Sequence, residues 1–173
     1  MTPVVETPRL VLRGRTLADF PVFAAMQADA RVMRFIAGAP VPEEDAWSKF
    51  ARMEGFWLLT GIGFWLIEEK ASGAVIGEIG LANFRRAIDP PLGDDPEFGW
   101  MLAAGAQGKG YASEALGAAL QWGDQRFPGA RFCCIIDEEN TPSVRLAERY
   151  GFRRERAATY KGKNVIVFRR AAT

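Results

Sequence analysis

The sequence predicts an α+β fold with one mixed sheet, and three observations lead to it. Apolar residues recur at strand or helix spacing in the order one strand, two or three helices, three strands, a helix, a strand, a helix and two strands. A glycine-rich turn joins the fourth strand to the helix after it. The chain has 173 residues, a length that favours a single domain over residues 1–173. We therefore expect about seven strands, mostly antiparallel, flanked by about four helices.

The first third of the chain is predicted to form a strand followed by helices. Val4–Arg15 alternates as a strand does. Thr16–Asp19 matches a helix-capping box, although Pro21 allows the helix to begin at Asp19 instead. A short helix is expected over Ala30–Phe35. A longer one should run from Pro42 to about Leu59, because a proline followed by three acids is a favourable helix start.

Two strands and a proline-rich segment are predicted for the middle of the chain. Gly63–Lys70 and Ala74–Phe84 have strand patterns and are separated by a short turn. The segment Arg85–Pro96 contains three prolines, one glycine and three aspartates, so we expect an exposed loop. Because it precedes the strand that begins at Glu97, both a substrate lid and a plain connector remain open.

The strongest functional signal lies where a strand passes through a glycine-rich turn into a helix. Glu97–Leu102 has a strand pattern, and Gly105, Gly108 and Gly110 follow it. From Tyr111 the apolar residues fall at helical spacing until a Pro-Gly pair stops the helix. Free backbone N–H groups before a helix attract anions, since the helix dipole acts in the same direction. The turn is therefore predicted to hold a phosphate-bearing cofactor.

Two widespread phosphate-binding patterns do not fit this turn. The Walker pattern Gly-x-x-x-x-Gly-Lys-Ser/Thr would have Ala103 at its first position and Gly110 where Mg²⁺ needs a hydroxyl. The dinucleotide pattern Gly-x-Gly-x-x-Gly would begin at Gly108 but end at Ser113. A nucleotide-hydrolysing P-loop protein is therefore disfavoured.

The last part of the chain is predicted as a strand, a short helix and a strand pair. Arg131–Asp137 is the strand. Thr141 is a suitable N-cap before a proline, and Gly151 is a suitable helix end. Phe152–Thr159 and Asn164–Arg170 should then pair antiparallel across a short turn.

Composition and charge exclude several classes of function. A formal net charge of +1 gives no reason to expect a nucleic-acid or anionic-membrane partner. The most apolar stretch, Phe56–Ile67, is too short to span a bilayer. Thr2–Arg13 lacks the apolar run of a signal peptide, so we expect a cytoplasmic protein.

The histidine and cysteine content limits the chemistry further. The chain has no histidine, which excludes a Ser-His-Asp triad, a Cys-His pair and histidine-bound zinc. No metal is expected. The two cysteines, Cys133 and Cys134, are adjacent and would point to opposite faces of a strand. Buried free thiols are therefore favoured over a disulfide.

Three segments together resemble one enzyme family. Gln107-x-x-Gly110-x-Ala112, between a strand and a helix, resembles the acetyl-coenzyme A loop of the GNAT acetyltransferase superfamily. Asn140–Ser143 with Gly151-Phe152 is similar to the Asn-x-x-Ser…Gly-Phe segment of its RimJ/RimL-like branch, which includes enzymes that acetylate ribosomal-protein N-termini. Thr7–Arg13 resembles the opening strand of that branch. The segments stand in the branch's order and cover essentially the whole chain.

The resemblance implies a sheet that is splayed around acetyl-coenzyme A. Loop amides would bind the pyrophosphate, and the pantetheine arm would lie along Phe98–Leu102. A backbone N–H near Trp100 or Met101 would stabilise the oxyanion. The residues expected to bind the cofactor are Trp100, Met101, Leu102, Gln107, Gly108, Lys109, Gly110, Tyr111, Ala112, Asn140 and Ser143.

Without histidine, a carboxylate or a water held by one must accept the proton of the amine. Glu97, at the start of the site strand, is the first candidate for this catalytic base. Glu78 comes second if it faces the same crevice, and Glu148 comes third. A surface or structural role remains open for each.

Two polar residues of the second segment are candidates for the remaining catalytic steps. Ser143 would donate to the leaving thiolate, and Asn140 would bind the cofactor arm or the water that takes the proton. Helix capping is the alternative for both. Many superfamily members have a tyrosine acid at the position that is Ala147 here, so this sequence departs from that pattern.

The sequence thus predicts an acetyl-coenzyme A-dependent N-acetyltransferase that acts by direct attack of a primary amine on the thioester. The acceptor would be a protein or peptide N-terminus, or a small amine. The alternative is a non-catalytic acyl-coenzyme A-binding module. A homodimer remains open, because an exposed sheet edge could pair with a second copy.

Overall fold

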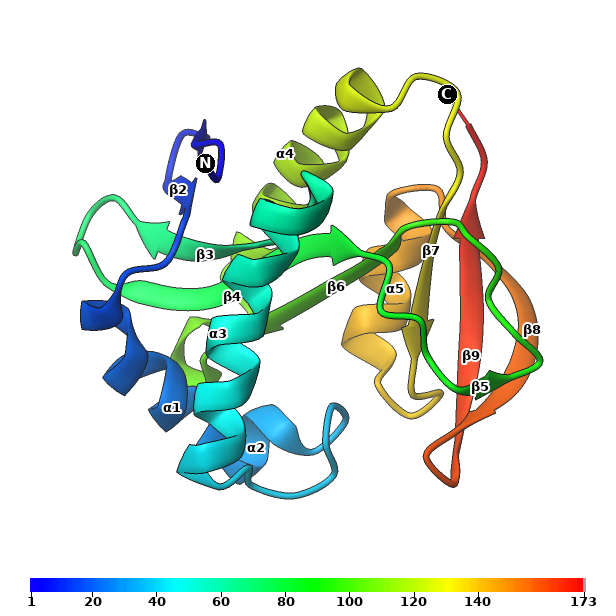
Figure 1. Ribbon diagram of the computed structural model, residues 1–173, viewed down its shortest axis with the longest axis horizontal. Helices are drawn as coiled ribbons and strands as arrows, with labels where there is room; N and C mark the ends of the chain where they lie inside the picture. The colour runs from blue at the N-terminus through cyan, green and yellow to red at the C-terminus, as the bar shows by residue number, and fades with distance from the viewer. Residues whose placement is uncertain (173) are drawn as a thin grey trace.

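The computed structural model describes residues 1–172, and their strands form one open sheet of nine strands (Figure 1). The order across the sheet is β1-β2-β3-β4-β6-β7-β9-β8-β5, and every neighbouring pair is antiparallel except β6–β7. The strands are β1 (Val5–Glu6), β2 (Leu10–Arg13), β3 (Phe64–Glu69), β4 (Val75–Ala82), β5 (Ile88–Asp89), β6 (Glu97–Leu102), β7 (Phe132–Ile136), β8 (Arg153–Tyr160) and β9 (Lys163–Arg170). The predicted mixed, mostly antiparallel α+β fold is confirmed.

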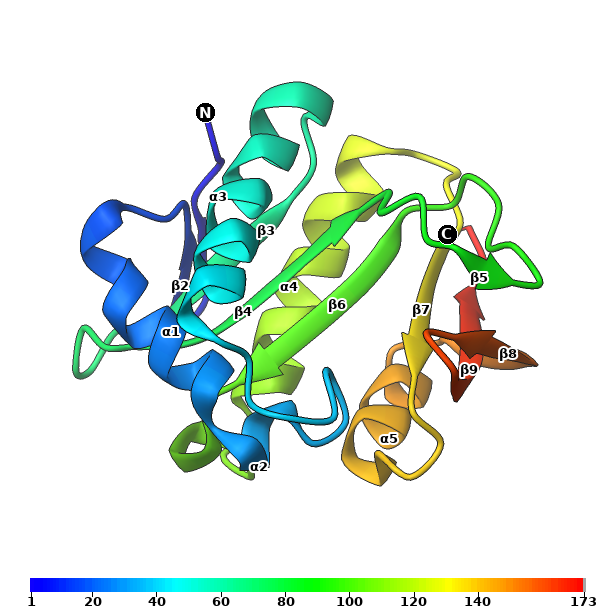
Figure 2. The same cartoon turned by 60° about the horizontal axis from the view of Figure 1, so that its bottom comes forward.

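Five α-helices cover the sheet on both faces (Figure 2). They are α1 (Phe20–Ala28), α2 (Ala30–Met33), α3 (Glu43–Thr60), α4 (Tyr111–Arg126) and α5 (Thr141–Arg149), with 3₁₀ turns at Leu17–Asp19 and Ala104–Ala106. Helices α1 to α3 enclose one core with the strand residues Leu66 and Met101. Helices α4 and α5 share the other core. Trp65 and Leu102, which precede Leu66 and follow Met101 in the chain, belong to this second core. This division follows from the alternation of side chains along each strand.

The first predicted strand is interrupted, which is one reason for nine strands rather than about seven. Thr7-Pro8 breaks the run into β1 and β2, and the two pair with each other through Val5 and Leu12. The capping box at Thr16 is confirmed, because the carboxylate of Asp19 accepts hydrogen bonds from the N–H and the hydroxyl of Thr16 at 2.7 and 2.9 Å. This box caps a 3₁₀ turn, and α1 starts immediately after Asp19, as the alternative start predicted.

The proline-rich segment 85–96 contains a strand that local pattern did not predict. Within it, β5 pairs with β8, and Ile88 is buried. Arg156 donates to the carbonyl of Pro91 at 2.7 Å, and Arg169 forms an ion pair with Asp95. The segment is largely exposed, as predicted, but it is also fastened to the C-terminal hairpin at several points.

The two ends of α5 and the state of the cysteines were also predicted. The N-cap of α5 is Asn140 rather than Thr141, and its side-chain oxygen accepts a hydrogen bond from the N–H of Ser143 at 3.3 Å. Gly151 follows the helix with a positive φ of 85°, as predicted for its end. Cys133 and Cys134 are buried free thiols, as expected.

Among residues 1–172 no helix is long and apolar enough to cross a membrane. The same part of the chain contains no group of three or more potential metal-ligating side chains.

Candidate active site

The sheet opens between its two parallel strands. Strands β4 and β6 are in register over six residue pairs, whereas β6 and β7 share only the pair Glu97–Cys133. The N–H of Cys133 donates to the carbonyl of Pro96 at 3.1 Å, next to this pair. Beyond it the two strands diverge, and both point toward the face where α4 and α5 begin (Figure 2). The hydrogen bonding of the sheet is therefore interrupted at the carboxyl ends of its parallel strands, where α/β proteins commonly bind ligands, and we call this interruption the slot.

The hydrogen-bond alternation of β6 determines which backbone atoms face this slot. The N–H of Ala103 donates to Ile76 at 2.8 Å, so Ala103 and every second residue before it direct their backbone groups toward β4. Met101 belongs to this set, and its side chain lies in the α1–α3 core. Trp100 and Leu102 belong to the other set and direct their backbone groups into the slot. The structure thus brings two of the three predicted strand residues to the site and places Met101 away from it.

The glycine-rich turn after β6 presents free backbone donors. Gly108 and Gly110 have φ values of 76° and 80°, a region that strongly favours glycine, and Gly110 is the N-cap of α4. Within residues 1–172 no intramolecular acceptor takes the N–H groups of residues 108 to 112. The side chain of Gln107 instead donates to the carbonyl of Leu102 at 3.2 Å, which braces the turn against the end of β6.

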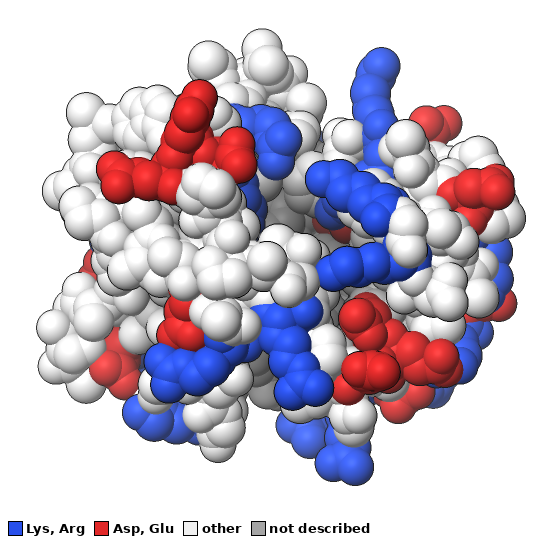
Figure 3. All heavy atoms as spheres, turned by 90° about the horizontal axis from the view of Figure 1, so that it is seen from below, with Lys and Arg blue, Asp and Glu red and all other residues white. Residues whose placement is uncertain are grey.

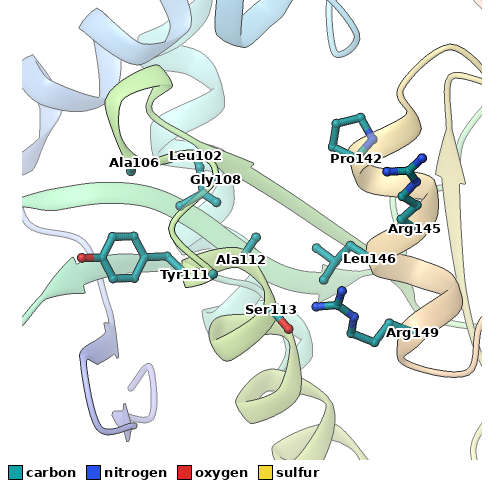
Figure 4. A pocket seen from close by; sticks show the side chains of 11 residues that line it. Leu102, Ala106, Gly108, Tyr111, Ala112, Ser113, Pro142, Arg145, Leu146 and Arg149 are labelled. Atoms are coloured by element: carbon teal, nitrogen blue, oxygen red, sulfur yellow. The ribbon is translucent and has the colours of Figure 1, made fainter.

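A cavity of about 260 Å³ lies between this turn and α5 (Figure 4). Its walls are formed by Leu102, Ala106, Gly108, Gly110, Tyr111, Ala112 and Ser113 on one side and by Pro142, Arg145, Leu146 and Arg149 on the other. The ring of Tyr111 points away from α5, and its hydroxyl donates to Glu69, so this residue offers its backbone N–H rather than its side chain.

The electrostatics of the cavity favour an anion. No acidic residue lines it, whereas Arg145 and Arg149 do. The guanidinium of Arg9 lies just outside the turn, where it donates to the carbonyl of Lys109 at 3.0 Å and forms an ion pair with Glu114. In a view onto this face, Lys and Arg side chains gather around a hollow (Figure 3). Free amides, a helix dipole and cations thus fit a phosphate-bearing group.

Ser143 and Asn140 lie at the start of α5, beside the slot. The indole N–H of Trp100 donates to the hydroxyl oxygen of Ser143 at 3.2 Å, which links β6 to α5 across the parted strands. Asn140 caps the helix, so the structural role that the sequence left open is present for this residue. The structure therefore brings Ser143 next to Trp100, with Asn140 as the cap of the same helix.

Glu97 is buried at the closed end of the slot. Its two carboxylate oxygens accept hydrogen bonds from Arg86 at 2.6 and 2.7 Å. Arg86 also donates to the hydroxyl of Tyr160 at 2.9 Å and lies over the ring of Phe84. Burial raises the pKa of Glu97 above its ordinary value, although Arg86 opposes this shift. Both members of the pair line a second cavity of about 180 Å³ beneath the segment 91–95.

The other two candidate carboxylates have different surroundings. Glu78 is buried beside Lys49 and Arg15, at 2.8 and 3.5 Å. Burial alone would raise the pKa of Glu78, but the two cations outweigh it and hold that pKa below its ordinary value. Glu148 is exposed on α5. Of the three carboxylates, only Glu97 belongs to β6, the strand that borders the slot.

Comparisons with known proteins identify the family. Residues 9–153 match the family model described as an acetyltransferase (GNAT) domain. Because this match covers most of the chain, the protein belongs to the GNAT acetyltransferase family and is an N-acetyltransferase by membership. Enzymes of this family use acetyl-coenzyme A.

Particular relatives support the same assignment. The chain is 28% identical to the uncharacterised N-acetyltransferase YnaD of Bacillus subtilis (strain 168), covering 87% of this chain and 83% of that protein. It is also 28% identical over 110 residues to the uncharacterised protein YkkB of the same organism, where it spans 62% of that relative's length.

Solved structures show the same fold over nearly the whole chain. A protein from Bordetella pertussis described as a GnaT-family acetyltransferase is 32% identical, with a TM-score of 0.86 and coverage of 98% of this chain and 99% of that one. The ribosomal-protein α-N-acetyltransferase RimL, solved in complex with coenzyme A, has a TM-score of 0.79 at 16% identity and coverage of 98% of each chain. The RimL likeness shows the fold alone.

The structure adds three site residues that the sequence interpretation did not include. Arg145 and Arg149 are four residues apart, so the helix pattern could have placed them on one face of α5. Arg86 had no comparable signal, because its pairing with Glu97 depends on the path of the intervening loop.

Proposed function

We propose that this protein transfers the acetyl group of acetyl-coenzyme A to a primary amine by direct attack of the amine on the thioester. One observation carries the proposal: β6 separates from β7 after a single residue pair, and the freed edge leads to a turn whose amides have no partner within residues 1–172. A slot for an extended arm that ends at an anion site is what a phosphorylated thioester carrier requires.

The backbone donors would hold the two ends of the cofactor. The amides of residues 108 to 112 bind the diphosphate, and Gln107 keeps their turn in place. Leu102 and Trp100 line the path of the pantetheine arm. The N–H of Trp100, which the alternation of β6 directs into the slot, donates to the thioester carbonyl oxygen as that oxygen gains negative charge.

Glu97 is the proposed base of the reaction. Its raised pKa lets it bind a proton more readily than an exposed glutamate does. Both of its oxygens are engaged by Arg86, so a water molecule relays the proton from the amine to the carboxylate. Ser143 donates to the sulfur that leaves, with Trp100 fixing its hydroxyl.

The acceptor is proposed to be an α-amine of a protein or peptide, or a small amine of similar basicity. An α-amine has a pKa of about 8, so about a tenth is unprotonated at pH 7, against less than one part in a thousand for lysine. The likeness in fold to RimL, whose name gives a ribosomal-protein α-amine as its acceptor, agrees with this preference.

A non-catalytic acyl-coenzyme A-binding module is the second candidate. The observation that favours it is the engagement of both buried carboxylates by cations, which leaves neither Glu97 nor Glu78 free.

Thiol release from acetyl-coenzyme A, measured with a panel of peptide α-amines, lysine peptides and small amines, separates the two candidates. The enzyme shows saturable, amine-dependent release. Cofactor affinity with no amine-dependent turnover across the panel would establish the binding module instead.

A further inference from the structure

Two kinds of anion-binding group face each other across the 260 Å³ cavity. One wall holds the free amides of the turn and the N-terminus of α4. The opposite wall holds the guanidinium groups of Arg145 and Arg149, four residues apart on α5. Figure 4 shows the side chain of Arg149 extending from α5 toward Ser113 on the first turn of α4, while Arg145 lies closer to Pro142.

Neither arginine has a structural partner that would explain it. Among residues 1–172, no ion pair or side-chain hydrogen bond is formed by Arg145 or Arg149. Two arginines of the C-terminal hairpin are paired, by contrast: Arg154 with Glu138, and Arg170 with Asp124. No acidic residue lines the cavity, so the charges of Arg145 and Arg149 are not neutralised there. The α5 wall, opposite the free amides, is therefore positively charged.

We infer that Arg145 and Arg149 form a second phosphate subsite that binds the 3′-phosphate of coenzyme A and selects it over 3′-dephospho-coenzyme A. The inference rests on the proposed function, since it assigns the diphosphate to the amides of the turn. Coenzyme A carries phosphate at two places, the diphosphate and the 3′-position of its ribose. A ligand with the diphosphate alone would leave the arginine wall without a counter-charge. A terminal phosphate dianion matches guanidinium donors in geometry and in charge.

Calorimetric titration of the full chain with coenzyme A and with 3′-dephospho-coenzyme A tests the inference. The wild type should bind coenzyme A about tenfold more tightly, a size expected for solvent-accessible charge-assisted contacts. The R145Q/R149Q variant should lose about tenfold in affinity for coenzyme A and almost none for the dephospho form, so that the ratio falls to about one.

A matched control removes two other exposed arginines. R52Q/R153Q makes the same change in net charge away from the cavity and should leave both affinities and their ratio unchanged. A reduced preference in this control would mean that general attraction by net charge, and not a subsite, discriminates the ligands.

A second measurement needs no variant. The nucleotide 3′,5′-ADP carries a 3′-phosphate that 5′-AMP lacks, so it should compete with coenzyme A about tenfold more strongly on the wild type.

Three outcomes would overturn the inference, and they differ in what they say of the proposed function. Equal loss of both ligands in R145Q/R149Q would show that the arginines hold the diphosphate. Unchanged affinities with a raised KM for the amine would assign them to the acceptor. In both cases the acetyltransferase remains. Failure of the wild type to bind either ligand would remove the proposed function together with the subsite.

Discussion

Glu97 and Glu78 are two buried carboxylates whose pKa values move in opposite directions. Burial disfavours the ionised form of each. Glu97 has one guanidinium to offset that effect, and the pKa of Glu97 stays above its ordinary value. Glu78 has both Lys49 and Arg15, and the pKa of Glu78 is lowered. A carboxylate must bind a proton to serve as a base, so Glu97 is the better suited of the two.

Replacing Glu97 with Gln should therefore change the pH dependence of the reaction. A base works in its deprotonated form, so the wild-type rate should rise with pH through the raised pKa of Glu97 and then level off. E97Q should be slower by about a hundredfold near pH 7, in the range typical of general bases. The difference should shrink at higher pH, where the free amine forms without help. Initial rates from pH 6 to 10 with a peptide α-amine measure this.

The E78Q variant is the matched control for this experiment. It also removes one buried negative charge, but from β4, which β6 separates from the slot. It should leave the shape of the pH profile unchanged. If the ratio of the wild-type rate to the E97Q rate were the same at every pH, Glu97 would not be the base. The same conclusion would follow if the rate of E78Q, and not that of E97Q, fell in a pH-dependent way.

At the scale of single elements, the turn before α4 makes the sharpest prediction. A side chain at Gly108 would meet no protein atom within 4 Å, so the fold has room for it. The same position has a φ of 76° and lines the cavity, so a valine would strain the turn and occupy space needed by the diphosphate. G108V should therefore lower the affinity for coenzyme A by more than about tenfold.

Gly105 provides the control for that substitution. It lies three residues earlier, has no positive φ, and a Cβ built there also meets nothing within 4 Å. G105V should bind coenzyme A as the wild type does. Calorimetry measures both variants, and full affinity in G108V would contradict the assignment of the turn.

Element by element, the sequence predicted what depends on local residues. The glycine turn, the capping box at Thr16, the helix start at Pro42 and the alternation of Glu97–Leu102 are local patterns, and the structure contains each of them. The two-residue strand β5 escaped prediction because its pairing partner, β8, is more than sixty residues away and its flanking prolines indicate a loop.

The candidate site divides in the same way. Gly108, Gly110, Tyr111 and Ala112 line the cavity and belong to the predicted loop motif. The motif does not fix the hydrogen-bond alternation of β6, so it could not show that Met101 directs its backbone toward β4. The ion pair between Arg86 and Glu97 could not be predicted either. It joins two residues on either side of a loop whose path is set by distant contacts with β8 and β9.

For the molecule as a whole, the parted strands leave two halves that are joined weakly through the sheet. One half holds β1 to β4 and β6, the other holds β7, β9, β8 and β5, and a single residue pair connects them within the sheet. The proposed cofactor would contact α4 on one side and α5 on the other. Its binding energy should therefore stabilise the junction between the halves more than either half by itself.

Acetyl-coenzyme A should consequently raise thermal stability and slow amide exchange in particular segments. At a free concentration 100 times Kd the added stability is about 2.7 kcal/mol, which raises Tm by about 5 to 10 °C for a chain of this size. Hydrogen exchange followed by mass spectrometry should show the largest protection in α5 and in residues 103–112, with little change in β2 and β3. Adenosine at equal concentration serves as the control, because it lacks the phosphates and the arm. Protection spread evenly over the chain, or limited to the turn while α5 exchanges as before, would show that the ligand does not bridge the two halves.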